Sequence, residues 1–233
     1  MDQSVFEHHG PWTEAAYRAL GHDGRVEVID GTLLVGPGAG PQRARVIERV
    51  RAAVAAALPD GLAVRGPVPL RLSRDCVLVP DLVVTAAEPP DEAAADAPDE
   101  DGGEVDGKPA EEPVEEPAGP VLDAAAALLV IEVVGHEHGA VDRSFKPQLY
   151  ARSRIPYSLL IDHDSPFAVA DMIIGGRYHE YAHARGDERL LIEEPFVLEL
   201  DLAALTAPAA DGEDGEDDPA PTEALVHTPA EAH

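Results

Sequence analysis

The chain has 233 residues, of which 45% are hydrophobic, enough for one domain with a substantial core. Its formal net charge of −28 argues at first against a nucleic-acid-binding protein, and its single cysteine, Cys76, excludes an intramolecular disulfide and a thiolate metal site. The N-terminal sequence lacks the basic and apolar regions of a signal peptide, and no run reaches the roughly 18 apolar residues of a membrane span. We therefore expect a cytoplasmic protein with no membrane partner.

The negative charge is concentrated in two segments. Between Ala87 and Gly119 thirteen acids face one base, Lys108, for a net charge of −12, and residues 207–233 carry −8 without any Lys or Arg. Both segments are rich in Pro, Ala, Gly and acids and contain no aromatic residue, so they cannot bury enough apolar area to offset chain entropy. We predict a domain over residues 12–206, interrupted by a disordered acidic insertion at 87–120 and followed by a disordered acidic tail at 207–233.

Two short elements are predicted near the N-terminus. Thr13 can cap a short helix over Trp12–Leu20, in which Tyr17 shares an apolar face with Leu20. The pair Asp30-Gly31 accepts the positive φ angles of a two-residue turn and predicts a hairpin over Arg25–Val35.

A longer amphipathic helix is predicted over Pro41–Leu58, because apolar residues recur there at helical spacing. We place its arginines on the opposite side, where they would offer a positive face to a phosphate backbone. A later helix offers a second such face, and the sequence does not choose between them. The two sets are Arg43, Arg45, Arg49 and Arg51, and Arg143, Arg152 and Arg154.

Strands and one further helix, Asp142–Arg154, complete the predicted fold, with Gly175-Gly176 as a second hairpin turn. The order of the elements predicts a mixed α/β sheet with helices on its faces. The predicted strands are Ala63–Val68, Leu70–Leu72, Leu78–Thr85, Ala127–Val134, Tyr157–Asp162, Ala168–Ile174, Arg177–Ala182 and Leu190–Leu200.

Two apolar runs carry one acidic residue each: Asp81 in LVPDLVVT and Glu132 in LLVIEVV. A carboxylate among apolar residues costs several kcal/mol in desolvation unless a positive group lies against it. Mg²⁺ meets this need, and Lys146 adds a positive charge, so the three residues together indicate a metal-dependent phosphodiesterase. Each doubling of a loop costs only about 0.6 kcal/mol, so the acidic insertion does not keep the two carboxylates apart.

The ordered set of motifs resembles the Uma-two family of bacterial restriction endonucleases, in the PD-(D/E)xK nuclease superfamily. The likeness covers roughly Trp12 to Leu205. It implies a restriction-endonuclease-like core with flanking helices and an added antiparallel set of C-terminal strands. It also implies an endonuclease that uses Mg²⁺, or Mn²⁺ in its place, on DNA, and a homodimer would suit cleavage of both strands. The motifs are VEVIDG at 26–31, VPDLVV at 79–84, LLVIEVV at 128–134 and DRSFKPQLYARSRIPYSLLID at 142–162.

The resemblance implies a role for each site residue. Asp81 and Glu132 would be the metal-binding carboxylates, with Glu27 a further acidic member. The carbonyl oxygen of Val133 would be another metal ligand, and Lys146 would orient the attacking water or steady the phosphate. Asp81, Glu132 and Lys146 are thus the predicted catalytic residues. Further matches with supporting roles are Asp142, Arg143 and Tyr150.

Three departures from the family pattern affect this assignment. Gly135-His136-Glu137-His138 stands where the family tends to place Ser-Pro-Ser-Thr, which alters the loop beside the metal. Gln42 and Arg43 stand where the family has a histidine. Pro147 follows Lys146, and proline disfavours helical angles in the residue before it. If Ser144 caps the helix, Pro147 falls in the first turn and does little harm, whereas a helix that begins at Asp142 could turn Lys146 away.

Three other interpretations stay open. A Zn²⁺ or Ni²⁺ site could use histidines, although two that are four residues apart on a strand lie about 13 Å apart. The acidic insertion could cover the site and repel DNA, giving a self-inhibited nuclease or a binding module. A degenerate member could keep the fold without catalysis. The candidate histidines are His136 and His138, which flank Glu137 where the family has Ser-Pro-Ser-Thr, and His179 and His183.

Overall fold

The computed structural model describes residues 8–20, 25–36, 38, 40–87, 121–136 and 141–208. Residues 88–120 and 209–233 lie outside the described residues, as do Glu137 and His138, so the predicted disorder of the acidic segments stays a prediction. None of the helices in the described ranges is long and apolar enough to cross a bilayer.

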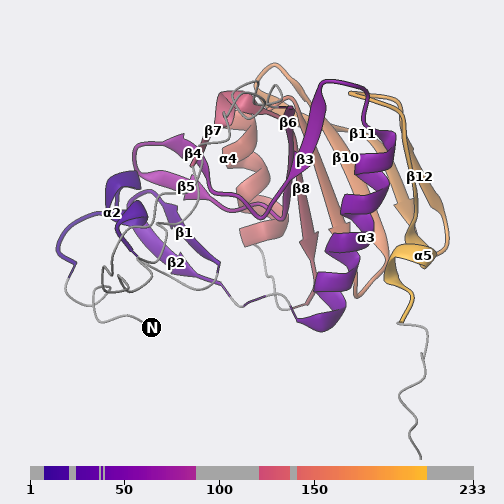
Figure 1. The fold of residues 1–233 in the computed structure, drawn as a ribbon, viewed down its shortest axis with the longest axis horizontal. Coiled ribbons are helices and arrows are strands. Elements are labelled where there is room, and N and C mark those ends of the chain that lie inside the picture. Colours follow the sequence, from indigo (N-terminus) through magenta and orange to yellow (C-terminus); the bar gives the residue numbers. More distant parts are fainter. Residues whose placement is uncertain are drawn as a thin grey trace, which may run out of the picture.

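A six-stranded mixed sheet of order β11-β10-β9-β8-β6-β3 forms the centre of the molecule (Figure 1). β8 and β9 are parallel, and all other neighbours in this sheet are antiparallel. The mixed sheet predicted from the sequence is therefore confirmed. Its strands are β3 (Leu62–Arg65), β6 (Leu82–Ala86), β8 (Ala127–Val134), β9 (Tyr157–Asp162), β10 (Phe167–Ile174) and β11 (Arg177–Arg185).

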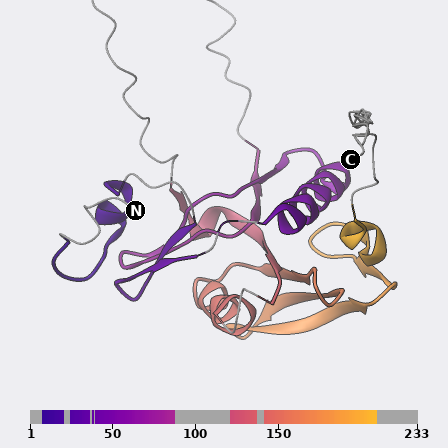
Figure 2. The same ribbon diagram turned by 90° about the horizontal axis from the view of Figure 1, so that it is seen from below.

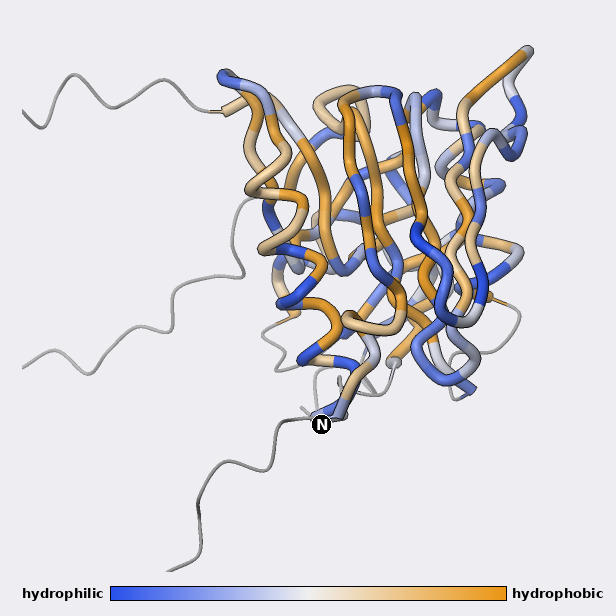
Figure 3. Tube along the Cα trace, turned by 90° about the vertical axis from the view of Figure 1, so that its right-hand side faces the viewer, coloured by the Kyte–Doolittle hydropathy of each residue, from blue (hydrophilic) through white to orange (hydrophobic). Residues whose placement is uncertain are grey.

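Helices cover the two faces of this sheet: α3 (Pro41–Ala57) lies on one and α4 (Lys146–Arg152) on the other (Figure 2). Alternate residues of a strand point to opposite faces, so Ile131 of β8 packs with the α3 side and Val130 with the α4 side. Long hydrophobic stretches accordingly run along the strands, while hydrophilic residues lie at several turns and at intervals within the strands (Figure 3).

A second, five-stranded sheet of order β2-β1-β5-β4-β7 lies beside the first. The predicted hairpin is confirmed, with positive φ angles of 48° at Asp30 and 74° at Gly31. The N-terminal helix, α2 (Glu14–Arg18), is shorter than predicted, but Thr13 caps it as expected by accepting a hydrogen bond from the Ala16 amide at 3.3 Å. The strands are β1 (Val26–Ile29), β2 (Thr32–Val35), β4 (Leu70–Ser73), β5 (Cys76–Leu78) and β7 (Leu122–Asp123).

The predicted strand Leu78–Thr85 is wrong in one respect, because it is broken between the two sheets. β5 ends at Leu78 in one sheet and β6 begins at Leu82 in the other. Pro80 has no amide hydrogen for a strand ladder, and the amide of Val79 donates instead to Oε1 of Glu27 at 2.8 Å. Asp81 therefore lies where the chain crosses from one sheet to the other.

Two other predicted elements also differ. The single strand Leu190–Leu200 is a hairpin of β12 (Arg189–Ile192) and β13 (Leu198–Asp201), because Pro195 cannot donate to a strand ladder; α5 (Leu202–Thr206) follows. The helix predicted from Asp142 begins at Lys146, after a π-helical turn over Val141–Phe145. A 3₁₀ turn, Ala124–Ala126, precedes β8.

Candidate active site

Strand pairing brings Asp81 and Glu132 together. Leu82 of β6 pairs with Ile131 of β8 in antiparallel register. Asp81, which precedes Leu82, therefore lies opposite Glu132, which follows Ile131. Both carboxylates are buried, with 4% of Asp81 and 3% of Glu132 exposed. The amide of Val133 donates to Oδ2 of Asp81 at 2.7 Å and fixes that carboxylate.

Lys146 points into the same site and is fully buried. Its Nζ lies 2.7 Å from Oε1 of Glu27, 2.6 Å from Oδ1 of Asp142 and 3.4 Å from Oε1 of Glu132. Pro147 falls in the first turn of α4, where its missing amide hydrogen costs little, so it does not turn Lys146 away. The structure thus brings together the four predicted side chains Glu27, Asp81, Glu132 and Lys146.

Arg25 is a member of the site that the sequence analysis missed. Its Nη1 lies 3.1 Å from Oδ1 of Asp81, and its Nη2 donates to Oε2 of Glu132 at 2.6 Å. It also lies 3.8 Å from carboxylate oxygens of Glu27 and Asp142. The available signal was its position two residues before Glu27, which places both side chains on one face of an extended segment.

Arg43 is also a site residue, and its predicted position on the polar side of the first long helix was wrong. Its Nε donates to the carbonyl oxygen of Val133 at 2.7 Å, and its Nη2 donates to Oδ1 of Asp81 at 2.5 Å. Only 4% of Arg43 is exposed. It precedes the apolar residues Val46 and Ile47 by three and four positions, so helical spacing places it on their face.

Neutral donors complete the arrangement. The hydroxyl of Tyr150, on α4, donates to Oε1 of Glu132 at 2.6 Å, in agreement with the predicted supporting role. Each of the two central carboxylates is therefore held by one oxygen and presents the other to Arg25: Oδ1 of Asp81 and Oε2 of Glu132.

Burial and charge set the pKa values of these acids. Burial, with the nearby charge of Glu132, raises the pKa of Asp81 to about 6, although Arg25 and Arg43 oppose the shift. Burial likewise raises the pKa of Glu27. Burial also acts to raise the pKa of Glu132, but the charges of Lys146 and Arg25 and the Tyr150 hydroxyl outweigh it and hold that pKa below its usual value.

Gly66 is a supporting residue that the sequence analysis missed. Its φ is +140°, and a Cβ added there would lie 2.2 Å from the carbonyl oxygen of Asp81 and 2.9 Å from the Cα of Leu82. Only glycine allows this approach, so Gly66 helps to place the backbone that presents Asp81.

A hollow of about 430 Å³ opens onto the site. Arg25, Arg43 and Asp81 line it, together with Arg51 and Glu48 from α3. Three arginines thus face two carboxylates in the hollow, which favours an anionic group as its occupant.

Comparison with known proteins identifies the family. A family model described as "Uma2: Putative restriction endonuclease" matches residues 13–204. The chain belongs to the Uma2 family. No curated protein matches it.

A solved structure supports the fold of this Uma2 protein. The crystal structure of "a putative nuclease belonging to DUF820" from Anabaena variabilis is 14% identical in sequence, with a TM-score of 0.59. The match covers 84% of this chain and 98% of that chain. The predicted family and the mixed, restriction-endonuclease-like architecture are both confirmed.

The oxygens of the Uma2 site suit a hard divalent cation, as the family resemblance implies. Oδ1 of Asp81, Oε2 of Glu132 and the carbonyl oxygen of Val133 each accept a hydrogen bond from a guanidinium group, so all three are turned toward positive charge. Carboxylate and carbonyl oxygens are the ligands that Mg²⁺ and Mn²⁺ prefer. Within the described ranges, no group of three or more His, Cys, Asp or Glu is arranged to hold a metal, so a main-chain oxygen or substrate would have to complete the shell.

The histidines do not form a rival metal site in the described part of the chain. Nδ1 of His136 lies 2.8 Å from Oδ2 of Asp164, and Nδ1 of His183 lies 2.6 Å from Oε1 of Glu180. His179 and His183 are on β11, where each pairs with a different residue of β10. His136 and His183 thus have local acidic partners, and His138 lies outside the described residues.

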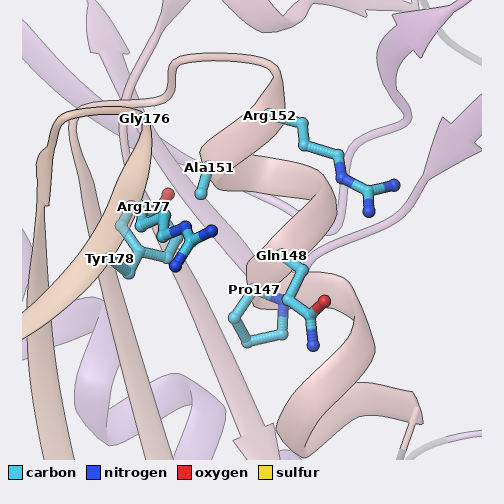
Figure 4. A pocket seen from close by; sticks show the side chains of 7 residues that line it. All are labelled: Pro147, Gln148, Ala151, Arg152, Gly176, Arg177 and Tyr178. Atoms are coloured by element: carbon cyan, nitrogen blue, oxygen red, sulfur yellow. The ribbon is translucent and has the colours of Figure 1, made fainter.

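The two predicted basic faces differ in the structure. On α3, Arg49 donates to the carbonyls of Ala204, Leu205 and Ala207, and Arg51 donates to the carbonyl of Gly66. On α4, the exposed Arg152 lines a groove of about 520 Å³ that also contains the exposed Arg177. Figure 4 shows Arg177 and Tyr178 on the hairpin side of this groove and the α4 residues on the other.

Proposed function

We propose that this Uma2 protein is a nuclease that hydrolyses DNA phosphodiester bonds with Mg²⁺, or Mn²⁺ in its place, and that it acts in the cytoplasm. The observation that carries the proposal is the convergence of Asp81, Glu132, Glu27 and Lys146 from four separate segments into one buried cluster beside a hollow rich in arginine. Buried carboxylates beside a lysine are the groups that phosphodiester hydrolysis needs.

The site residues would have distinct chemical roles. Asp81, Glu132 and the Val133 carbonyl would hold the ion, which when bound supplies an activated water and neutralises charge on the phosphate. Glu27 anchors the Nζ of Lys146 at 2.7 Å. Lys146 keeps Glu132 ionised and offers its positive charge to the attacked phosphate.

Tyr150 and the amide of Val133 are positioning groups. The Tyr150 hydroxyl holds Oε1 of Glu132, which leaves Oε2 for the ion. The Val133 amide does the same for Asp81 by holding Oδ2 and leaving Oδ1. Both carboxylates are therefore held in place before the substrate arrives, and only the guanidinium groups that bond Oδ1 and Oε2 would have to shift for the ion.

The groove beside α4 would supply a further contact with the nucleic-acid backbone, away from the hollow at the site. Arg152 and Arg177 are exposed in one groove whose lining contains no carboxylate, whereas the α3 arginines other than Arg45 are engaged within the protein. Changing both Arg152 and Arg177 to Ala should weaken DNA binding and reduce its dependence on salt concentration. An unchanged salt dependence would exclude the groove.

The direct experiment measures nicking of supercoiled plasmid by the full chain with Mg²⁺ or Mn²⁺. Glu132→Gln should lose roughly 10²-fold or more of the activity. Glu199→Gln, an exposed acid on β13 that pairs with Arg189, is the matched control and should retain it. Equal activity in all three proteins would indicate a contaminating nuclease, and no activity in any would favour the degenerate or self-inhibited interpretation. A homodimer stays a prediction that the ratio of nicked to linear product would address.

A further inference from the structure

Arg43, like Arg25, bonds two of the atoms that the proposed function assigns to the ion. Its guanidinium donates to Oδ1 of Asp81 and to the carbonyl oxygen of Val133. We propose that Arg43 is a displaceable cation. It occupies these oxygens in the free protein, and it moves away from them to bind a nucleic-acid phosphate, which frees the oxygens for the ion. Divalent-ion binding and nucleic-acid binding are then coupled. This inference rests on the proposed function.

Arg43 is the basic group that the cluster holds least firmly. Arg25 lies within 3.8 Å of four carboxylates, and Lys146 within 3.4 Å of three. Arg43 contacts one carboxylate and one carbonyl. When Arg43 moves away, Asp81 keeps its ion pair with Arg25, so no buried carboxylate loses its last positive partner.

Arg43 is among the residues that line two hollows. It lines the 430 Å³ hollow with Arg25 and Arg51, and a second hollow of about 260 Å³ with Gln42 and His136. An anionic group in the first hollow would lie beside Arg43, whereas Asp164 also lines the second and makes it less suited to an anion. Arginine suits this exchange because its planar fork binds a phosphate as well as a carboxylate.

The charge of the cluster couples binding of the divalent ion to binding of the phosphate. The cluster has four carboxylates and three basic groups, a net charge of −1 (Glu27, Asp81, Glu132, Asp142; Arg25, Arg43, Lys146). A divalent ion at Oδ1 of Asp81 would share its ligands with the Arg43 guanidinium, and like charges at that distance repel strongly in a buried site. A phosphate gives Arg43 another partner, so each ligand should strengthen binding of the other by the same factor.

The test uses Ca²⁺ as the probe and measures its dissociation constant by calorimetry, with and without a short DNA duplex. For the wild type, DNA should tighten Ca²⁺ binding about tenfold or more. Arg43→Gln should bind Ca²⁺ about tenfold more tightly than the wild type without DNA, and DNA should add little. Arg45→Gln, an exposed arginine two residues along the same helix, is the control and should behave as the wild type.

Three results would overturn the inference. Equal Ca²⁺ affinity in wild type and Arg43→Gln without DNA would show that Arg43 does not compete, while the proposed ion site would stand. Equal tightening by DNA in both proteins would assign the coupling to other residues. No Ca²⁺ binding to any variant, with or without DNA, would remove the proposed function and the inference with it. Should Arg43→Gln not fold, Arg43→Lys carries the test, because one ammonium cannot bridge both oxygens as the guanidinium does.

Discussion

Replacing Lys146 by Met tests whether the buried cluster is held by its charges. The side chains are similar in length, so packing is largely kept, but three carboxylates lose their shared cation. The net charge of the cluster falls from −1 to −2. Removing one partner of a buried ion pair costs about 3–5 kcal/mol, and we expect a loss of that size in the free energy of unfolding.

A double-mutant cycle makes this prediction specific. Glu27→Gln alone keeps an oxygen that can accept from the Val79 amide, and in combination with Lys146→Met it restores the net charge of −1. Urea unfolding at pH 7 should show that the double variant is more stable than the sum of the two single losses predicts, by about 0.5–3 kcal/mol. The loss in the free energy of unfolding caused by Lys146→Met alone should also become smaller as the pH is lowered toward 5, because the unpaired carboxylates take up protons. Strict additivity, or a Lys146→Met loss below about 1 kcal/mol, would refute the reasoning.

Three further changes test individual contacts. The pKa of Asp81 is raised to about 6, so the folded state holds that proton more tightly than the unfolded chain does. The stability that the protonated group contributes should therefore fall by about 2 kcal/mol between pH 4 and pH 6. Urea unfolding of Asp81→Asn should lack this fall, and parallel pH profiles of the two proteins would contradict it. Gly66→Ala should lower the free energy of unfolding by several kcal/mol. The control is Gly61→Ala, where φ is +85° and the space around the glycine is open, and it should cost only about 1 kcal/mol. Similar costs for the two variants would show that the contact with Asp81 is unimportant. Tyr150→Phe should cost about 1.5–3 kcal/mol in urea unfolding by removing the hydrogen bond to Glu132, and a change below 0.5 kcal/mol would contradict that role.

The sequence predicted the parts of the fold that follow from local periodicity. The hairpin turn at Asp30-Gly31 and the strands Ala127–Val134 and Tyr157–Asp162 occur as expected, because turn chemistry and burial determine them locally. The crossing of the chain from one sheet to the other at Pro80 was not predicted, because the apolar residues of this segment do not indicate which sheet they join.

The acidic members and the lysine of the candidate site were predicted, while its arginines were not. An acid in an apolar run is conspicuous, whereas Arg43 looked like one of several helix arginines, although its spacing to Val46 placed it on the buried face. Arg25 lies outside β1, and only the tertiary structure brings it against Asp81. The close approach of Gly66 likewise depends on two segments that are distant in sequence.

The most direct test of the central claim is anomalous diffraction from crystals of the full chain grown with Mn²⁺ and a DNA duplex. We predict one Mn²⁺ peak bound by Oδ1 of Asp81, Oε2 of Glu132 and the carbonyl oxygen of Val133, with Arg43 turned toward a phosphate. A map with the DNA bound but no Mn²⁺ at these oxygens, or with the peak elsewhere on the protein, would contradict the account.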